Sequence, residues 1–188
     1  MTNPMLQRGS PREWANRSQV FETTGKIDDF SRLVEIIEAD LRPLKTGDRP
    51  QKWRQAPVDI RLRFAWVEEL PGIPLLEGRV STTVAAVCQR CLEPFEMAVA
   101  TDLKLLLPET SESTAAQDGY EVWEFDEREV RPLDIVEEAL IMAMPLSALH
   151  ESSDECGVLA TASRPDNDDT VRPFAELKSL MARTDDED

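Results

Sequence analysis

Residues 82–107, TTVAAVCQRCLEPFEMAVATDLKLLL, contain two apolar runs of strand-like composition. Between the runs lie a Cys-x-x-Cys motif, from Cys88 to Cys91, and the pair Pro94-Phe95. Two cysteines at this spacing can share a metal ion or form a redox pair. The motif therefore predicts a hairpin whose turn is held by two sulfur atoms, although by itself it indicates no reaction.

Alternation of apolar and polar residues predicts three antiparallel strands around this motif, at 60–66, 76–86 and 95–107. Apolar residues at helical spacing predict two helices, at 28–41 and 132–144. Asp28 or Asp29 is the expected N-cap of the first helix. We therefore expect an α+β fold, an antiparallel β-meander or partial barrel covered by two helices.

A length of 188 residues fits one folded domain with less regular ends. Residues 1–20 lack periodicity and are predicted to be a flexible N-terminal arm, followed by an α+β domain at 21–157. Residues 158–188 are predicted to be a mostly disordered acidic tail that contains a short amphipathic helix at 173–181. Phe174, Leu177 and Leu180 form the apolar side of that helix, which could bind a partner or pack back on its own domain.

Several classes of protein are excluded by motifs that the sequence lacks. The N-terminus has no apolar core of signal-peptide length, and the longest apolar run is too short to cross a bilayer, so we expect a cytoplasmic protein that does not bind membranes. An odd count of three cysteines argues against a secreted disulfide framework. No glycine-rich phosphate loop, HExxH motif or nucleophile elbow occurs, and there is a single histidine, so we expect no enzymatic activity.

The net charge of −16 is unevenly distributed along the chain. Residues 1–63 carry a net charge of +3, which leaves −19 for the remainder. A body this acidic repels phosphate backbones, because nucleic-acid binding depends on several Lys or Arg contacts that release counterions. The charge therefore favours a basic protein partner over extensive direct contact with RNA, unless the acidity serves solubility alone.

The motif Cys88 to Cys91 supplies two of the four ligands of a tetrahedral zinc site. Cys156 is the only other thiol and His150 the only imidazole, so the candidate ligand set is Cys88, Cys91, His150 and Cys156. One alternative is a reduced cysteine pair that serves packing. Another is a thioredoxin-like redox pair, but such a motif normally begins a helix, whereas strand-like runs flank this one.

Four segments in this order resemble the YceD family, described as large ribosomal RNA subunit accumulation proteins. They are VCQRCLEPFE at 87–96, DIVEEALIMAMPL at 134–146, HESSDEC at 150–156 and RPFAELKSL at 172–180. The resemblance implies a small cytoplasmic protein without catalytic residues that acts in synthesis, processing or stability of large-subunit (23S) ribosomal RNA. The cysteine pair of the family matches Cys88 and Cys91, whereas some relatives have more C-terminal cysteines than the single Cys156 found here.

The acidic charge adds a class of partner to this resemblance. An RNA role in so acidic a protein is better explained by binding to a basic protein of the ribosome or its assembly machinery than by direct contact with RNA. The alternative function is a zinc-binding structural or thiol-redox module without an RNA role. A redox pair would have a strongly lowered cysteine pKa, which alkylation rates measured against pH would reveal.

Overall fold

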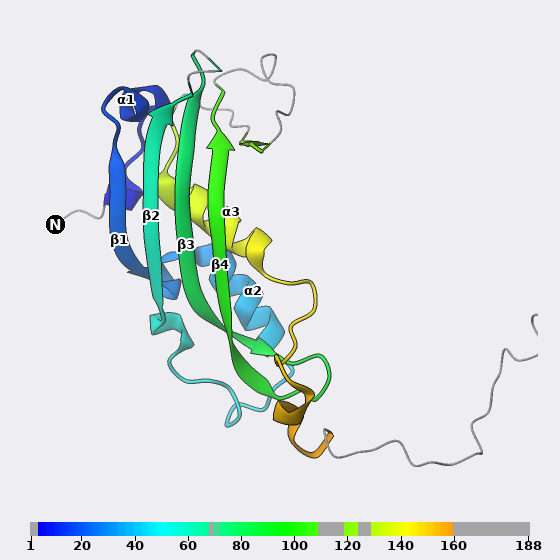
Figure 1. Ribbon diagram of the computed structural model, residues 1–188. Coiled ribbons are helices and arrows are strands. Elements are labelled where there is room, and N and C mark those ends of the chain that lie inside the picture. The colour runs from blue at the N-terminus through cyan, green and yellow to red at the C-terminus, as the bar shows by residue number, and fades with distance from the viewer. Residues whose placement is uncertain (1–3, 68–69, 71, 109–118, 124–128, 160–188) are drawn as a thin grey trace, which may run out of the picture.

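The fold is a single open sheet with helices on one face (Figure 1). The computed structural model describes residues 4–67, 70, 72–108, 119–123 and 129–159. The strands lie in chain order: β1 (Val20–Lys26), β2 (Pro57–Trp66), β3 (Pro74–Val87), β4 (Pro94–Leu106) and β5 (Glu121–Val122). The first four are antiparallel to their neighbours, and β5 pairs parallel with the end of β4. The predicted α+β fold is confirmed, with an open meander in place of a partial barrel.

The alternation in the sequence places one face of the sheet in the core. In β2 the even-numbered residues from Val58 to Phe64 are buried, and the odd-numbered residues between them are exposed. Pairing with β3 brings Phe64 opposite Leu76 on the buried face. A Cβ atom at Gly78 of β3 would lie 2.3 Å from the carbonyl oxygen of Arg61, so the close approach of β2 and β3 requires glycine at this position.

Two helices cover the buried face of the sheet (Figure 1). The buried aliphatic residues are Leu33, Val34, Ile37 and Leu41 in α2 (Ser31–Leu41), and Ile135, Val136, Ala139 and Leu140 in α3 (Pro132–Ala143). Full burial of one leucine- or isoleucine-sized side chain stabilises the fold by about 1.5–3 kcal/mol. The helix predicted at 132–144 is confirmed. The helix predicted at 28–41 begins at Ser31, because the preceding residues form a separate turn, η2 (Ile27–Asp29).

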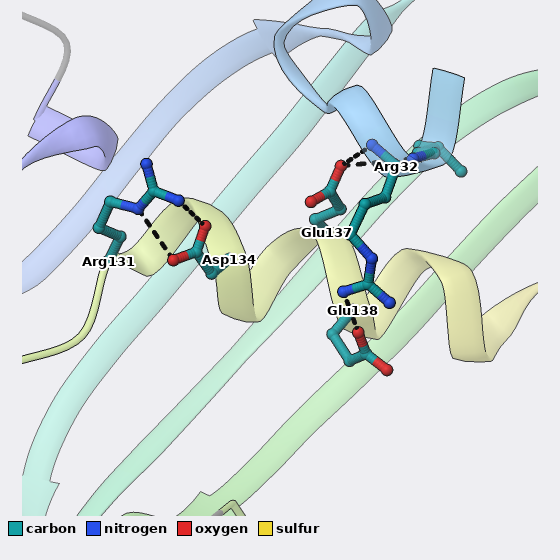
Figure 2. Close-up of polar contacts among 6 residues, drawn as sticks. Arg32, Arg131, Asp134, Glu137 and Glu138 are labelled. Atoms are coloured by element: carbon teal, nitrogen blue, oxygen red, sulfur yellow. Dashed lines mark hydrogen bonds and ion pairs between the residues drawn. The ribbon is translucent and has the colours of Figure 1, made fainter. Parts of the chain in front are cut away.

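The N-terminus of α2 is capped by a side chain of α3. The prediction that Asp28 or Asp29 caps this helix was therefore wrong. The Asp29 carboxylate instead accepts a hydrogen bond from the backbone N–H of Lys26, at 2.8 Å. The buried Glu137 of α3 accepts hydrogen bonds from the backbone N–H groups of Arg32, at 2.7 Å, and Leu33, at 3.3 Å (Figure 2). Those donors have no partner within the helix, and a carboxylate is favourable at a helix N-terminus.

The N-terminal residues pack against the sheet, which corrects the predicted flexible arm for the described residues 4–19. They form η1 (Pro4–Leu6) and α1 (Pro11–Asn16), and Met5 is buried. The ring of Trp14 lies 5.5 Å from that of Phe21 and 4.8 Å from that of Phe64. The segment is too short to show a helical period, so tertiary contacts order it, among them the Trp14 ring and the backbone hydrogen bonds between Gly9 and Val130.

The basic segment between α2 and β2 is held by hydrogen bonds within itself and by one aromatic contact with the core. The guanidinium of Arg49 donates to the carbonyl oxygens of Arg42, at 2.8 Å, and Leu44, at 3.2 Å. Trp53, at the start of η3 (Trp53–Gln55), is partly buried against the core.

Within the described ranges, no helix combines the length and apolar character that crossing a membrane requires.

Candidate metal centre

The Cys-x-x-Cys motif forms the turn of the β3–β4 hairpin, as the sequence predicted. The backbone N–H of Cys88 donates to the carbonyl oxygen of Glu93 at 3.0 Å, and that of Leu92 donates to the carbonyl oxygen of Cys88 at 2.8 Å. These two bonds close the turn between strands that pair as far as Val87 and Pro94. Both cysteines are therefore held at the end of a long, regular hairpin.

The segment that follows α3 returns to this turn and brings the other two candidate ligands. The backbone N–H of Gln89 donates to the carbonyl oxygen of Ala148 at 2.9 Å. The Arg90 guanidinium donates to the carbonyl oxygen of His150 at 2.7 Å. Cys156 lies in the short turn η5 (Ser153–Leu159), just beyond. Hydrogen bonds and one arginine thus align the two segments.

The structure brings together all four ligands predicted from the sequence. Their ligand atoms lie within 4.8 Å of one another. The Sγ atoms of Cys88 and Cys156 are 3.9 Å apart, and the Nδ1 atom of His150 is 3.6 Å from Sγ of Cys91 and 3.6 Å from Sγ of Cys156. In a tetrahedron with Zn–S bonds of about 2.3 Å, neighbouring sulfur atoms are about 3.8 Å apart. The donor set and its spacing therefore fit a tetrahedral zinc ion.

The comparison with known families found a match, over a span that contains this cluster. The family model described as large ribosomal RNA subunit accumulation protein YceD matches residues 76–181. The chain belongs to the YceD family. The matched span includes most of β3, all of β4 and α3, and the four candidate ligands of this YceD protein. No solved structure matches the chain.

Two of the candidate ligands have opposite shifts in acidity. Burial opposes ionisation of Cys88, but hydrogen bonds from the backbone N–H groups of Cys91, His150 and Arg90 outweigh it and lower the pKa of that thiol to about 5. Burial is the main cause that raises the pKa of Cys156 to about 11, and the neighbouring thiols of Cys88 and Cys91 add to it. The turn thus stabilises the Cys88 thiolate before any metal binds, whereas Cys156 would release its proton to solvent only when a cation binds to its sulfur.

A lowered cysteine pKa is also a property of redox motifs, but the backbone context here differs from that of thioredoxin. The residues after Cys88 form a turn between two strands, and no helix begins at the motif. In thioredoxin-like proteins the motif begins a helix, whose N-terminus stabilises the thiolate. The geometry of this YceD protein therefore favours metal binding over thiol-redox exchange.

Sequence patterns missed three residues that support the candidate centre. Asp40 of α2 accepts a hydrogen bond from the backbone N–H of Val87, at 2.8 Å, directly before the first ligand. The Phe95 ring lies 4.5 Å from the His150 ring and helps to orient it. Arg90 bridges the two segments. None of these residues has a local signal, because each acts on a segment that is distant in sequence.

The predicted partner-binding residues of this YceD protein lie outside the described residues. They are Phe174, Leu177 and Leu180, in the helix predicted at 173–181. They stay a prediction from the sequence.

Proposed function

We propose that this protein is a non-enzymatic, cytoplasmic factor in the biogenesis of the large ribosomal subunit. It would act in the synthesis, processing or stability of 23S ribosomal RNA through a basic protein partner. The observation that carries this proposal is the YceD family match over residues 76–181, since the name of that family refers to accumulation of large-subunit ribosomal RNA. The match includes the residues that form the candidate metal centre.

The charges of the described residues support a protein partner over direct contact with RNA. Five arginines are already bound to carboxylates: Arg32 with Glu138, Arg54 with Asp28 and Glu38, Arg61 with Glu22, Arg79 with Asp102, and Arg131 with Asp134. A paired guanidinium is a poor phosphate ligand, because its carboxylate partner repels the phosphate. A basic protein, by contrast, is attracted by the overall charge of −16.

In this proposal, zinc has a structural role. Cys88, Cys91, His150 and Cys156 supply four protein ligands, which fill a tetrahedral site and leave no open position for a substrate. The ion would hold the segment after α3 on the β3–β4 hairpin and contribute to folding free energy. A closed site of this kind supports a binding role in place of catalysis.

Deletion of the gene tests the proposed function directly. We expect the ratio of large-subunit to small-subunit ribosomal RNA to fall, with fewer free large subunits in ribosome profiles, because assembly of the large subunit would be impaired. RNA quantification and sucrose-gradient profiles measure both, and complementation with the wild-type gene should restore them. Unchanged ratios and unchanged profiles under stress would refute the proposal.

The class of partner can be tested with purified components. We expect the protein to bind at least one basic large-subunit ribosomal protein more tightly than it binds 23S RNA fragments at physiological salt. Added salt should slow association, because long-range charge acts mainly on the on-rate. Phe174→Ala should increase the dissociation rate about tenfold or more if this side chain is a buried anchor, whereas Phe174→Leu should have a smaller effect.

Kinetic binding measurements on the full-length chain provide the readout. Tight binding to 23S fragments alone, unaffected by Phe174→Ala, would contradict the protein-partner proposal. The basic residues of the segment from Arg42 to Arg63 would then be the first candidates for RNA contact.

A further inference from the structure

Three large apolar side chains are exposed beside the candidate metal centre. Leu92 is 65% exposed, Leu149 is 43% exposed, and Leu146 is fully exposed. We refer to Leu92, Leu146 and Leu149 as the knuckle patch. Exposed apolar residues are common singly, but a group of them on neighbouring segments indicates an interaction site.

The candidate ligands bring Leu92 and Leu149 of the knuckle patch together from two distant parts of the chain. Leu92 follows Cys91, and Leu149 precedes His150. The ligand atoms of Cys91 and His150 are only 3.6 Å apart. Hydrogen bonds from Gln89 and Arg90 hold the same two segments side by side. The apolar surface therefore depends on the same tertiary contact as the metal centre.

Leu92 is unfavourable in two ways in the isolated protein. Its φ angle is +61°, the left-handed conformation in which a branched side chain is an outlier and glycine is preferred. Its side chain also remains largely exposed to water. Strained backbone of this kind occurs at functional sites, where the surroundings hold it in place. A glycine would form the same turn without strain, so the leucine side chain itself requires an explanation.

Four exposed carboxylates lie on the two segments that carry the knuckle patch. Glu93, Glu151, Asp154 and Glu155 are exposed, and no ion pair is found for them among the residues that the structure describes. The only basic residue in these segments, Arg90, donates to the carbonyl oxygens of His150 and Ser152. We refer to the four carboxylates as the acidic rim. Unlike the carboxylates paired with arginines on the helices and sheet, those of the acidic rim are free to bind a cationic partner.

We propose that the knuckle patch and the acidic rim form a second surface, in addition to the helix predicted at 173–181, that binds the basic protein partner. An apolar side chain of the partner would cover Leu92 and Leu149, while its Lys or Arg side chains would bind the carboxylates of the rim. Burial in the complex would offset the exposure and strain of Leu92. The rim repels phosphate, so this surface excludes RNA. This inference rests on the proposed function, because it assigns a surface to the partner proposed there.

The substitution Leu92→Gly separates binding from folding. Glycine adopts positive φ without strain, so we expect a melting temperature equal to or above that of the wild type and an unchanged zinc content. Loss of the side chain should weaken binding at least tenfold, mainly through faster dissociation. Leu149→Ser is a second variant at the same surface. Leu6→Ala, at an exposed leucine that is distant in sequence from Leu92 and Leu149, is the control and should leave binding unchanged.

A charge reversal tests the acidic rim independently. The double substitution Glu151→Lys with Asp154→Lys should slow association several-fold at low salt. The double substitution Glu35→Lys with Asp48→Lys, at exposed carboxylates of α2 and the segment after it, makes the same change in net charge and should have a much smaller effect. The probes are individually purified large-subunit ribosomal proteins, with 23S RNA fragments measured in parallel, and all variants are full-length proteins with verified zinc content.

The possible results distinguish this surface from the proposed function. If a ribosomal protein binds the wild type and loses affinity with Leu92→Gly, Leu149→Ser and the double reversal, the surface is supported. If it binds all of these variants as tightly as the wild type, the surface is wrong while the protein partner stands. If no ribosomal protein binds the wild type, both the partner class and the surface are overturned.

Discussion

Removal of zinc is expected to lower the melting temperature of this protein by about 10 °C. Four ligands from two distant segments are brought within 4.8 Å of one another, so a bound ion cross-links the β3–β4 hairpin to the segment after α3. At a free zinc concentration a thousandfold above Kd, binding adds about 4 kcal/mol to stability. Each kcal/mol corresponds to about 2–4 °C in a domain of this size.

Calorimetry with and without a chelator measures this change, and metal analysis should find about one zinc ion per chain. Cys88→Ser should reproduce the effect of the chelator. Hydrogen exchange gives a local readout, since the N–H of Gln89, bonded to Ala148, should exchange faster after metal removal. The N–H of Gly9, bonded to Val130, is a control that should change much less.

The metal prediction also has a clear negative outcome. Protein purified without a chelator that contains no zinc, and a melting temperature that a chelator does not alter, would contradict it. Cys88, Cys91 and Cys156 would then be a reduced cluster that serves packing.

Replacement of Glu137 by alanine is expected to destabilise the fold by about 3 kcal/mol. The substitution would leave the N–H groups of Arg32 and Leu33 without their acceptor at the first turn of α2 (Figure 2). An unsatisfied buried donor costs about 1–3 kcal/mol. The substitution of Glu137 would also remove the carboxylate that interacts favourably with the positive end of α2.

Chemical denaturation of the variants measures this effect. Glu137→Gln retains an acceptor oxygen and should lose less stability than Glu137→Ala. Glu138→Ala is a matched control on the same helix, because it removes only the exposed ion pair with Arg32, which contributes little in water. Equal stabilities for Glu137→Ala and Glu138→Ala would show that the cap is not important for the fold.

Much of the fold was determined by patterns that act locally. Alternation over 60–66, 76–86 and 95–107 identified β2, β3 and β4, because side chains of a strand point to opposite faces in turn. The helical spacing identified α3, because apolar residues three and four positions apart lie on one face of a helix. The four candidate ligands were also predictable, because the chain has only three cysteines and one histidine. Such patterns state which face of an element is apolar, or which atoms can bind a metal.

Only the tertiary structure decided which distant residues meet. Glu137 accepts a hydrogen bond from Leu33, 104 residues earlier in the chain, and Trp14 joins the N-terminal segment to the sheet by packing on Phe64. The positive φ of Leu92 likewise follows from closure of the turn and cannot be recognised from a leucine in the sequence. Each of these features depends on a contact whose partner is chosen by packing of the whole domain. A local pattern carries no information about that partner, so the ligand set could be predicted from the sequence while the surface around it could not.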